Sequence, residues 1–417
     1  MDRRLNPYVP GAGLQPRELA GRDELLKEAN IDMERVMGGR PVRGLMLLGL
    51  RGVGKTVLLV RLKESAEKKG FKVGKIEAPE NGALPRLLAP ELRKILYALD
   101  LKASAAQSVR DAAAALRNFV AVFNVKIGDV EFGLKPSPGV ADTGDLTQDL
   151  PDLLVAVAQA AADRRSAVAI FIDEVQYLSL QELTAVVVAC HEISQRNLPL
   201  VLVGAGLPQI AALAGNAKSY AERLFTYKKI DQLDEEAARD ALTKPAKGSG
   251  VRFDKGAVDE ILRITERYPY FIQEWGSHVW DAAPKSPITK KDVEDVHAAV
   301  IGQLDESFFR VRFNRLTELE QKYLRAMAEL GAGAQRTGAI AEMLGVGAAN
   351  VGPIRQHLID KGMIWSPRHG QTSFTVPMFD QFMKREMPKL EKHKPKREAV
   401  TKAKSKAATA KSSKRGS

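Results

Sequence analysis

Strand-like and helix-like segments alternate over the first 230 residues. The runs that suit strands are 44–50, 71–78, 167–172 and 200–203, and the last two are continuously apolar, as in buried parallel strands. Apolar positions recur at helical spacing over 57–69, 84–101, 103–119, 149–163 and 180–195. Such alternation builds a parallel sheet covered by helices on both faces. The pattern predicts an α/β fold with a three-layer core, and a hairpin over 124–135, where apolar and polar residues alternate around Gly-Asp.

Two different patterns follow the core. Residues 231–300 are helical only, with aromatic residues gathered at 268–271 and 275–280, and we interpret them as an all-α lid. From 308 to about 386, three helical segments precede two short strand-like segments around a turn at 367–370, which predicts a winged helix-turn-helix. We therefore expect four regions: a core over 1–230, a lid over 231–300, a winged helix over 301–388 and a basic tail over 389–417.

Composition narrows the class of protein. The 417 residues suit two or three domains, and 45% hydrophobic with 27% charged residues is ordinary for a globular chain. The single cysteine, Cys190, excludes an intramolecular disulfide and a Cys-rich metal site, and core packing is its simplest role. The N-terminus lacks the apolar stretch of a signal peptide, and Pro and Gly interrupt the long uncharged run at 198–215. We expect a cytoplasmic protein, with nucleoid association as one option and no membrane contact.

Most of the positive charge lies in the tail. Residues 389–417 hold eleven Lys or Arg and two Glu, so nine of the twelve net positive charges lie there and the rest of the chain is nearly balanced. This low-complexity segment has almost nothing to bury and is expected to be disordered. Its charge suits sequence-independent attraction to phosphate backbones. A solubilising tail with no specific partner explains it equally well.

A phosphate-binding motif follows the first predicted strand. Residues 49–56 read Gly-Leu-Arg-Gly-Val-Gly-Lys-Thr, the full G-x-x-x-x-G-K-T pattern, between a strand and a helix. In this context backbone N–H groups converge on a phosphate at a helix N-terminus, so we expect ATP to bind here. Lys55 is expected to reach the β- and γ-phosphates, and Thr56 to bind Mg²⁺. The predicted nucleotide-binding residues are Gly49, Gly52, Val53, Gly54, Lys55, Thr56 and Val57.

Two carboxylates follow the strand at 167–172. Asp173 is expected at the carboxyl end of a central strand, where it would hold Mg²⁺ through water, and Glu174 one step further out, where it would orient or deprotonate a water molecule. Phosphoryl transfer to water needs positioning and charge neutralisation, which Lys55, Thr56, Asp173 and Glu174 supply together. The second carboxylate favours ATP hydrolysis over a small-molecule kinase reaction. We predict Glu174 and Lys55 as catalytic residues.

These motifs resemble those of the AAA+ ATPases, and within them the branch of archaeal initiator ATPases and the signalling ATPases called STAND. The resemblance extends to about residue 388 and includes Gly-Arg-Asp at 21–23, the two nucleotide motifs, the lid and the winged helix. It implies an arginine finger at Arg223, although a surface salt bridge is the alternative for this residue. The chain departs from the family after the strand at 200–203, where no Asn, Ser or Thr stands at the sensor-1 position. Residues 267–269 (Arg-Tyr-Pro) resemble the Gly-x-Pro element of STAND proteins, with arginine in place of glycine. Alternatively, Arg267 is a sensor-2 arginine. Core packing accounts for the neighbouring aromatic residues.

Two functions fit this organisation. One is a nucleotide-dependent switch that binds double-stranded DNA, with contacts from Arg355, Gln356 and Lys361 of the recognition helix and Arg368 of the wing, and with possible nucleotide-dependent homo-oligomers. The other is a STAND-like signalling ATPase whose winged helix serves autoinhibition or protein assembly. The absence of a repeat array or effector domain after the winged helix counts against the second function.

Overall fold

The computed structural model describes residues 1–80, 82, 84–99, 106–125 and 139–390, which divide into two compact units. The first is Met1–Arg310 with Thr375–Pro377, so it includes both the predicted core and the predicted lid. The second is Val311–Phe374 and the chain from Met378 on. Of the hairpin expected at 124–135, everything after 125 lies outside the described residues, and so does the tail from 391 on.

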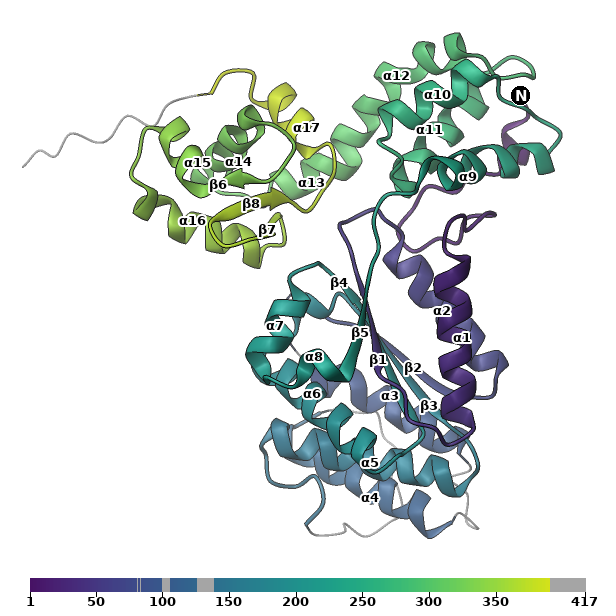
Figure 1. Cartoon of the computed structure of the whole chain (residues 1–417), viewed down its shortest axis with the longest axis vertical. Helices are drawn as coiled ribbons and strands as arrows, with labels where there is room; N and C mark the ends of the chain where they lie inside the picture. The colour runs from purple at the N-terminus through teal and green to yellow at the C-terminus, as the bar shows by residue number, and fades with distance from the viewer. Residues whose placement is uncertain (81, 83, 100–105, 126–138, 391–417) are drawn as a thin grey trace, which may run out of the picture. The chain divides into compact units, whose positions relative to one another are not determined.

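One five-stranded parallel sheet forms the centre of the first unit (Figure 1), in the order β2-β3-β4-β1-β5. Its strands are β1 (Gly44–Leu48), β2 (Lys72–Glu77), β3 (Val168–Asp173), β4 (Leu200–Gly206) and β5 (Phe225–Lys229). Every residue of β3 and β4 is buried, which explains their continuously apolar sequences. The predicted α/β fold with a parallel sheet is thus confirmed, while β5 was not expected because this edge strand carries two lysines and only one buried residue.

Helices cover the sheet on both sides (Figure 1). On one side are α1 (Asp23–Met37) and α2 (Lys55–Lys68), and α2 packs against β2, β3 and β4. The other side carries α3 (Leu84–Ala98), α4 (Gln107–Val122), α5 (Leu146–Asp163) and α6 (Leu180–Gln195). Two short helices, α7 (Ile210–Ala217) and α8 (Ala221–Leu224), connect β4 to β5. An extensive cluster of buried apolar residues lies between the sheet and α3–α6.

The strand order brings the two sequence motifs to one edge of the sheet. The phosphate loop follows β1, which pairs with β4, and Asp173 ends β3, which also pairs with β4. Because all three strands are parallel, their carboxyl ends lie side by side. In open α/β sheets, ligands bind at this edge.

Four helices form the lid part of the first unit: α9 (Glu235–Gly248), α10 (Lys255–Ile264), α11 (Pro269–Ala282) and α12 (Lys290–Leu304). Asp234, Asp254 and Thr289 begin three of them by accepting hydrogen bonds from backbone N–H groups of the first turn. The aromatic residues that the sequence gathers here include Trp275 and Trp280, which are fully buried. A π-helical turn, η3 (Asp305–Phe309), continues α12.

The N-terminal segment, residues 1–22, packs on this lid. No pattern in the sequence indicated this contact. Tyr8 is only 3% exposed, and its hydroxyl donates a hydrogen bond to the Leu242 carbonyl of α9. The Trp280 indole N–H donates to the Asp2 carbonyl at 3.0 Å. A Cβ atom at Gly276 of α11 would lie 2.7 Å from Cδ1 of Tyr8, so this glycine makes room for the tyrosine ring.

The second unit is small and mainly helical. It contains α14 (Glu318–Leu330), α15 (Thr337–Leu344), α16 (Ala348–Asp360) and α17 (Phe379–Glu386), with α13 (Arg310–Phe313) at its beginning. The strands β6 (Gln335–Arg336), β7 (Ile364–Trp365) and β8 (Gln371–Phe374) form an antiparallel sheet in the order β6-β8-β7. The helices α14 to α16 and the β7–β8 pair follow the predicted element order, whereas β6 and α17 were not expected.

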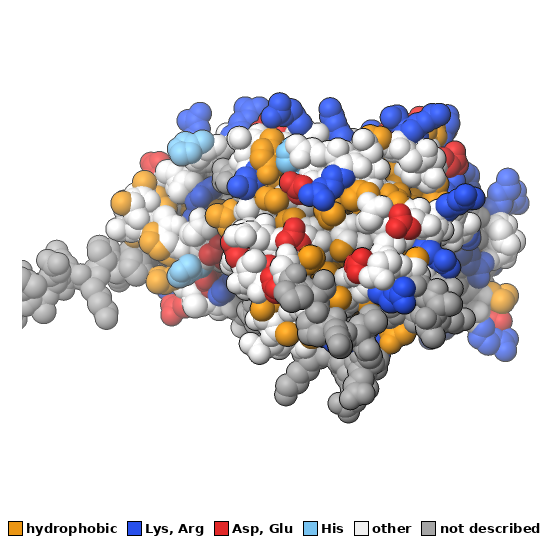
Figure 2. Space-filling model, turned by 90° about the horizontal axis from the view of Figure 1, so that it is seen from below, with side chains coloured by type: hydrophobic (Ala, Val, Ile, Leu, Met, Phe, Trp, Pro, Cys, Tyr) orange, Lys and Arg blue, Asp and Glu red, His pale blue; other side chains and the backbone are white. Residues whose placement is uncertain are grey.

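Charges of both signs are interspersed on the surface. On the face seen in Figure 2, Lys and Arg (blue), Asp and Glu (red) and apolar side chains (orange) lie among one another. This distribution fits the nearly balanced charge of residues 1–388. In the part of the chain that the structure describes, no helix is both long and apolar enough to cross a bilayer.

The contact between Tyr8 and α11 predicts unequal effects of two glycine substitutions. Gly276→Ala forces a Cβ atom against the Tyr8 ring and should lower the free energy of unfolding by about 1–3 kcal/mol. The matched control is Gly302→Ala on the exposed side of α12, where a Cβ would meet nothing within 4 Å; it should raise that free energy by about 0.5–1 kcal/mol. Urea unfolding of both variants tests this. Equal effects would contradict the tight packing of the N-terminal segment.

Candidate functional site

The phosphate loop spans residues 49–54 between β1 and α2, and its glycines meet different needs. Gly52 and Gly54 have φ angles of 82° and 90°, the left-handed region that favours glycine. Gly49 has no room for a side chain, because a Cβ there would lie 2.1 Å from the Ile230 carbonyl oxygen. Its N–H donates to the Gly206 carbonyl at 3.1 Å, which ties the loop to the end of β4. The motif therefore matches a loop that must bring its backbone close to a ligand.

Lys55 is a buried cation at the start of α2. Its side chain is 7% exposed, and Nζ donates to the Leu50 carbonyl at 2.8 Å. Burial lowers the pKa of Lys55 to about 8, against the attraction of Glu174 and Asp173, which favours the charged form. A buried ammonium that donates to a backbone carbonyl is well suited to gain an anionic partner such as a phosphate.

Asp173 and Thr56 are brought together at the end of β3. Asp173 is 2% exposed, and burial raises its pKa above the ordinary value, while a hydrogen bond with the Thr56 hydroxyl lowers it. A carboxylate and a hydroxyl are oxygen ligands of the kind that Mg²⁺ takes when substrate phosphates complete its shell. These two residues, which the sequence proposed as metal ligands, therefore fit magnesium in donor type and in position.

Glu174 adopts a left-handed backbone conformation, with φ 53° and ψ 40°, directly after Asp173. Each of its carboxylate oxygens has a partner. Oε2 accepts a hydrogen bond from the Gln176 amide, and Oε1 lies 3.8 Å from Nη1 of Arg51. Arg51 also donates to the Tyr177 hydroxyl at 2.7 Å.

Sequence reasoning missed these three partners of the site. Arg51 lies at a variable position of the phosphate motif, while Gln176 and Tyr177 follow Glu174 in a short 3-10 turn, η2 (Val175–Tyr177). The sequence could have indicated these residues only through their nearness to the motif residues. Neither motif specifies the residue type at those positions.

The lid and the N-terminal segment also contact residues of the predicted nucleotide site. The backbone N–H of Tyr270, in the first turn of α11, donates to the Gly52 carbonyl at 3.2 Å. Gln15 of the N-terminal segment donates through Nε2 to the Val57 carbonyl of α2 at 3.0 Å. The lid and the N-terminal segment therefore both contact the predicted nucleotide-binding residues.

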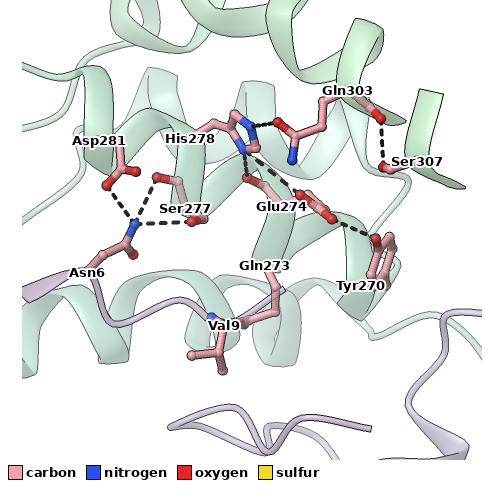
Figure 3. A network of polar contacts seen from close by, with 10 residues as sticks. All are labelled: Asn6, Val9, Tyr270, Gln273, Glu274, Ser277, His278, Asp281, Gln303 and Ser307. Carbon is pink, nitrogen blue, oxygen red and sulfur yellow. Dashed lines mark hydrogen bonds and ion pairs between the residues drawn. The ribbon is translucent and has the colours of Figure 1, made fainter. Parts of the chain in front are cut away.

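A polar network runs along α11 from the end that contacts the phosphate loop (Figure 3). The Tyr270 hydroxyl donates to Oε1 of Glu274, a buried carboxylate, at 2.6 Å. One turn further, His278 Nε2 lies 2.9 Å from Oε1 of Gln303 on α12. The Gln303 carbonyl in turn accepts from the Ser307 hydroxyl of η3 at 2.7 Å. Hydrogen bonds thus connect the start of α11 with the end of α12.

The N-terminal segment binds another side of α11 (Figure 3). Asn6 donates through Nδ2 to the Ser277 hydroxyl at 3.1 Å and to Oδ1 of Asp281 at 2.9 Å. The Val9 N–H donates to Oε1 of Gln273 at 3.2 Å. Residues 6–9 are therefore fixed to the same helix whose first turn contacts the phosphate loop.

Two arginines singled out by the family resemblance lie in different settings. Arg267 has a φ of 61°, in the left-handed region that favours glycine. Arg223 lies on the short helix α8, where its side chain is exposed.

The four residues predicted to contact DNA fall into two pairs. Arg355 and Lys361 are engaged inside the second unit: Arg355 donates to the Thr372 hydroxyl at 3.0 Å and to the Gln371 carbonyl at 3.2 Å. Lys361 donates at 2.7 Å to Glu320, a carboxylate that is only 3% exposed. Burial opposes the Glu320 charge, but the bonds from Lys361 and from the Thr317 N–H outweigh it and hold the pKa of Glu320 below its ordinary value.

Gln356 and Arg368 are exposed instead. Gln356 donates to Asp360 on the same face of α16, and Arg368 lies in the turn between β7 and β8. Exposed Arg336 of β6 lies opposite Gln371 of β8, close to that turn, and the N–H of its neighbour Thr337 donates to the Gly370 carbonyl at 2.9 Å. Sequence reasoning missed Arg336 because β6 has only two residues.

Comparisons with known proteins agree with this fold. Residues 18–203 match the family model described as AAA ATPase domain, and residues 306–383 match a model described as a domain of unknown function (DUF8462). The Walker-type ATPase PABY2304 of Pyrococcus abyssi is similar in structure, with a TM-score of 0.54 and 14% identity over 91% of this chain and 99% of that one. A search of curated proteins gave no match.

Two further structures are more distant. The ORC1 protein of Aeropyrum pernix in complex with DNA has a TM-score of 0.45 and 17% identity, over 93% of this chain and 96% of that one. The Holliday junction branch migration motor RuvB of Thermotoga maritima has a TM-score of 0.43 and 15% identity, over 89% of this chain and 99% of that one. Neither is similar enough to support an argument. The match over residues 18–203 and the fold shared with the Pyrococcus protein identify this part of the chain as an AAA ATPase domain with a P-loop ATPase fold, which supports nucleotide binding.

Proposed function

We propose that the protein is an ATP-binding and ATP-hydrolysing molecular switch whose nucleotide state controls DNA binding through a C-terminal winged helix. The observation that supports the ATPase part most strongly is the meeting of the phosphate loop with Asp173 and Glu174 at one edge of the sheet. This edge combines backbone donors, a buried ammonium and two carboxylates. Phosphoryl transfer to water requires these groups and little covalent chemistry from the protein.

The roles of the binding residues follow from their positions. Gly52, Val53 and Gly54 bring backbone N–H groups towards the phosphates, while Gly49, whose N–H is bonded to the Gly206 carbonyl, fixes the start of the loop. The N-terminus of α2, with Lys55 to Val57, adds its dipole. Lys55 neutralises phosphate charge. Thr56 and Asp173 would hold Mg²⁺, which would supply positive charge to neutralise the phosphates. Because Asp173 and Lys55 are buried, their charges are weakly screened by solvent.

Glu174 orients the attacking water and accepts its proton. It lies one residue beyond Asp173, at the edge where the γ-phosphate would end. Arg223 is exposed on α8, so it is free to act on the nucleotide of a neighbouring copy of the chain. Nucleotide-dependent homo-oligomers belong to this proposal for that reason.

The lid supplies the connection between nucleotide state and the rest of the chain. Its helix α11 contacts the Gly52 carbonyl through Tyr270 and reaches η3 through the Glu274, His278 and Gln303 network. A nucleotide that reorders the phosphate loop therefore changes the surroundings of the first turn of α11. A ligand shifts a conformational equilibrium only through such differential contacts.

DNA binding is assigned to the second unit and the tail. Helices α14 to α16 with the β7–β8 pair have the element order of a winged helix, and Gln356 and Arg368 are exposed on its third helix and its wing. Arg336 adds a cation near the wing. The tail supplies most of the net charge. We assign Arg355 and Lys361 a smaller part in DNA contact, because their hydrogen bonds within the unit compete with it.

A STAND-like signalling role is the second candidate. Arg355 and Lys361 donate hydrogen bonds inside the second unit, so two of the four side chains expected to contact DNA are already engaged. This observation favours the signalling role. In this case α16 and the wing would serve autoinhibition or assembly with a protein partner. DNA measurements distinguish the two candidates.

Two substitutions separate binding from turnover. Lys55→Ala removes a charge-assisted bond to phosphate and should weaken ATP binding by roughly tenfold to a hundredfold. Glu174→Gln should keep the affinity within about twofold and lower turnover by roughly 10²–10⁴. Isothermal titration and release of free phosphate measure the two effects. Full turnover in the Glu174 variant would remove this residue from the mechanism, and a phosphorylated small molecule in place of free phosphate would indicate a kinase.

ATP affinity should depend on pH through Lys55. Burial lowers the pKa of Lys55 to about 8 in the free protein, and a bound phosphate favours the charged form. Affinity should therefore be highest below pH 8 and fall about tenfold between pH 7 and pH 9. Titrations across this range test it. The control is Lys55→Arg, whose guanidinium stays charged; it should bind with little pH dependence, and parallel profiles for both proteins would contradict the prediction.

DNA binding should depend on salt and on the wing. Removing two phosphate contacts with Arg336→Ala/Arg368→Ala should reduce the slope of log affinity against log salt by about 2, and deletion of residues 389–417 should reduce it further. Fluorescence anisotropy with a labelled duplex measures the slope. Arg40→Ala/Arg252→Ala removes the same charge from exposed positions of the first unit and should leave the slope unchanged. Absence of duplex binding by the intact protein would favour the signalling role.

A further inference from the structure

We infer that Gln176 is a positioning residue for Glu174, the carboxylate that the proposed function assigns to water activation; this inference rests on that proposed function. Gln176 lies in the middle of η2, two residues after Glu174. Its two amide atoms have separate partners. Nε2 donates to Oε2 of Glu174, and Oε1 accepts from the Leu207 N–H at 3.0 Å.

These two bonds attach the Glu174 carboxylate to the end of β4. Leu207 directly follows β4, and the Gly206 carbonyl accepts the hydrogen bond from the Gly49 N–H of the phosphate loop. Gln176 therefore fixes the Glu174 carboxylate relative to the end of β4, and the same strand end also holds the phosphate loop. A general base must lie within hydrogen-bond reach of its water. Attachment of both Glu174 and the phosphate loop to the end of β4 therefore matters for turnover.

Gly206 provides the space for this arrangement. A Cβ atom at this position would lie 2.4 Å from Oε1 of Gln176 and 2.3 Å from Cδ1 of Ile210. Its backbone does not require glycine, since its φ angle is not among the positive ones of the chain. The missing side chain thus has a steric purpose: the amide of Gln176 occupies the position that a side chain of β4 would otherwise take.

The conformation of Glu174 makes the contact possible. Its left-handed backbone, with φ 53°, turns the chain sharply after β3 and starts η2, so the side chains of Glu174 and Gln176 meet. A left-handed glutamate costs conformational energy and persists only where its surroundings compensate. The bond from Gln176 and the approach of Arg51 to the other oxygen provide compensation.

With Oε2 held by Gln176, Oε1 is the oxygen that acts on water. In the structure this oxygen faces Arg51, a residue of the phosphate loop. The two oxygens are thus distinguished by their partners, one from η2 and one from the loop that binds the phosphates. An amide donor on Oε2 stabilises the charged carboxylate and limits its rotation.

The test compares Gln176→Glu and Gln176→Ala with the parent protein and with Glu174→Gln. Gln176→Glu keeps the shape and an acceptor for the Leu207 N–H, but at neutral pH it cannot donate to Glu174. It should lower kcat for phosphate release about tenfold or more, with the nucleotide Kd unchanged within about twofold.

Each outcome has one meaning. If Glu174→Gln abolishes turnover while Gln176→Glu and Gln176→Ala both keep the parent kcat, the positioning role is overturned and the proposed function stands. If Glu174→Gln itself retains turnover, the proposed function fails at this residue and the role of Gln176 fails with it. A parent-like kcat for Gln176→Glu with a reduced kcat for Gln176→Ala would assign Gln176 to holding β4 alone and would also overturn the inference.

A second variant approaches the same contact from β4. Gly206→Ala pushes on the Gln176 amide without changing a polar group and should lower kcat in the same direction. Gly204→Ala is the matched control on the same strand, because its Cβ would meet Met46 and Val175 and not Gln176. If both glycine variants fold and lower kcat equally, the effect belongs to strand packing and counts against the inference.

Discussion

The pairing of β1 between β4 and β5 is the constraint on which the candidate site depends. Leu48 pairs with Gly206 on one side and with Lys229 on the other, and the hydrogen bonds continue past the strand, from Ile230 N–H to the Leu48 carbonyl and from Gly49 N–H to the Gly206 carbonyl. The beginning of the phosphate loop is thereby held from both sides. This explains why Gly49 has no room for a side chain and why the start of the loop is fixed relative to the sheet.

Burial of opposite charges gives this edge its chemistry. Lys55 and Asp173 are both removed from solvent, which destabilises each charged form: the pKa of the lysine falls and that of the aspartate rises. Neighbouring opposite charges offset part of this cost. A phosphate and a divalent cation would offset more of it, so the free energy spent in burying these groups favours binding of a charged ligand.

The connections of α11 extend the influence of the site beyond the core. Its first turn contacts the phosphate loop, one side binds residues 6–9, and another side reaches α12 through His278 and Gln303. These hydrogen bonds connect the first turn of α11 with residues 6–9 and with α12. In the second unit, the bonds of Arg355 and Lys361 serve internal cohesion, which shows that a cation on an exposed-looking helix is not automatically available to a ligand.

Local sequence patterns were sufficient to predict much of this structure. The four core strands, the helices between them and the glycine loop were predictable because apolar periodicity and motif chemistry depend on residues that are near in sequence. The placement of Asp173 at the strand end followed from the same local pattern. That Thr56 meets Asp173 could be expected as well, since parallel strands of a βα fold end at one edge.

Other features were decided only by contacts between distant residues. The sequence of β5 is too polar to indicate a strand, and its pairing with β1 creates the strand. The packing of Tyr8 on α9 and α11 joins residues more than 230 positions apart. Likewise, Gln176 acquires its role from Leu207 and Gly206, and Arg355 and Lys361 from β8 and Glu320. A residue type states which bonds a side chain can make, whereas only the tertiary structure decides which partner is within reach.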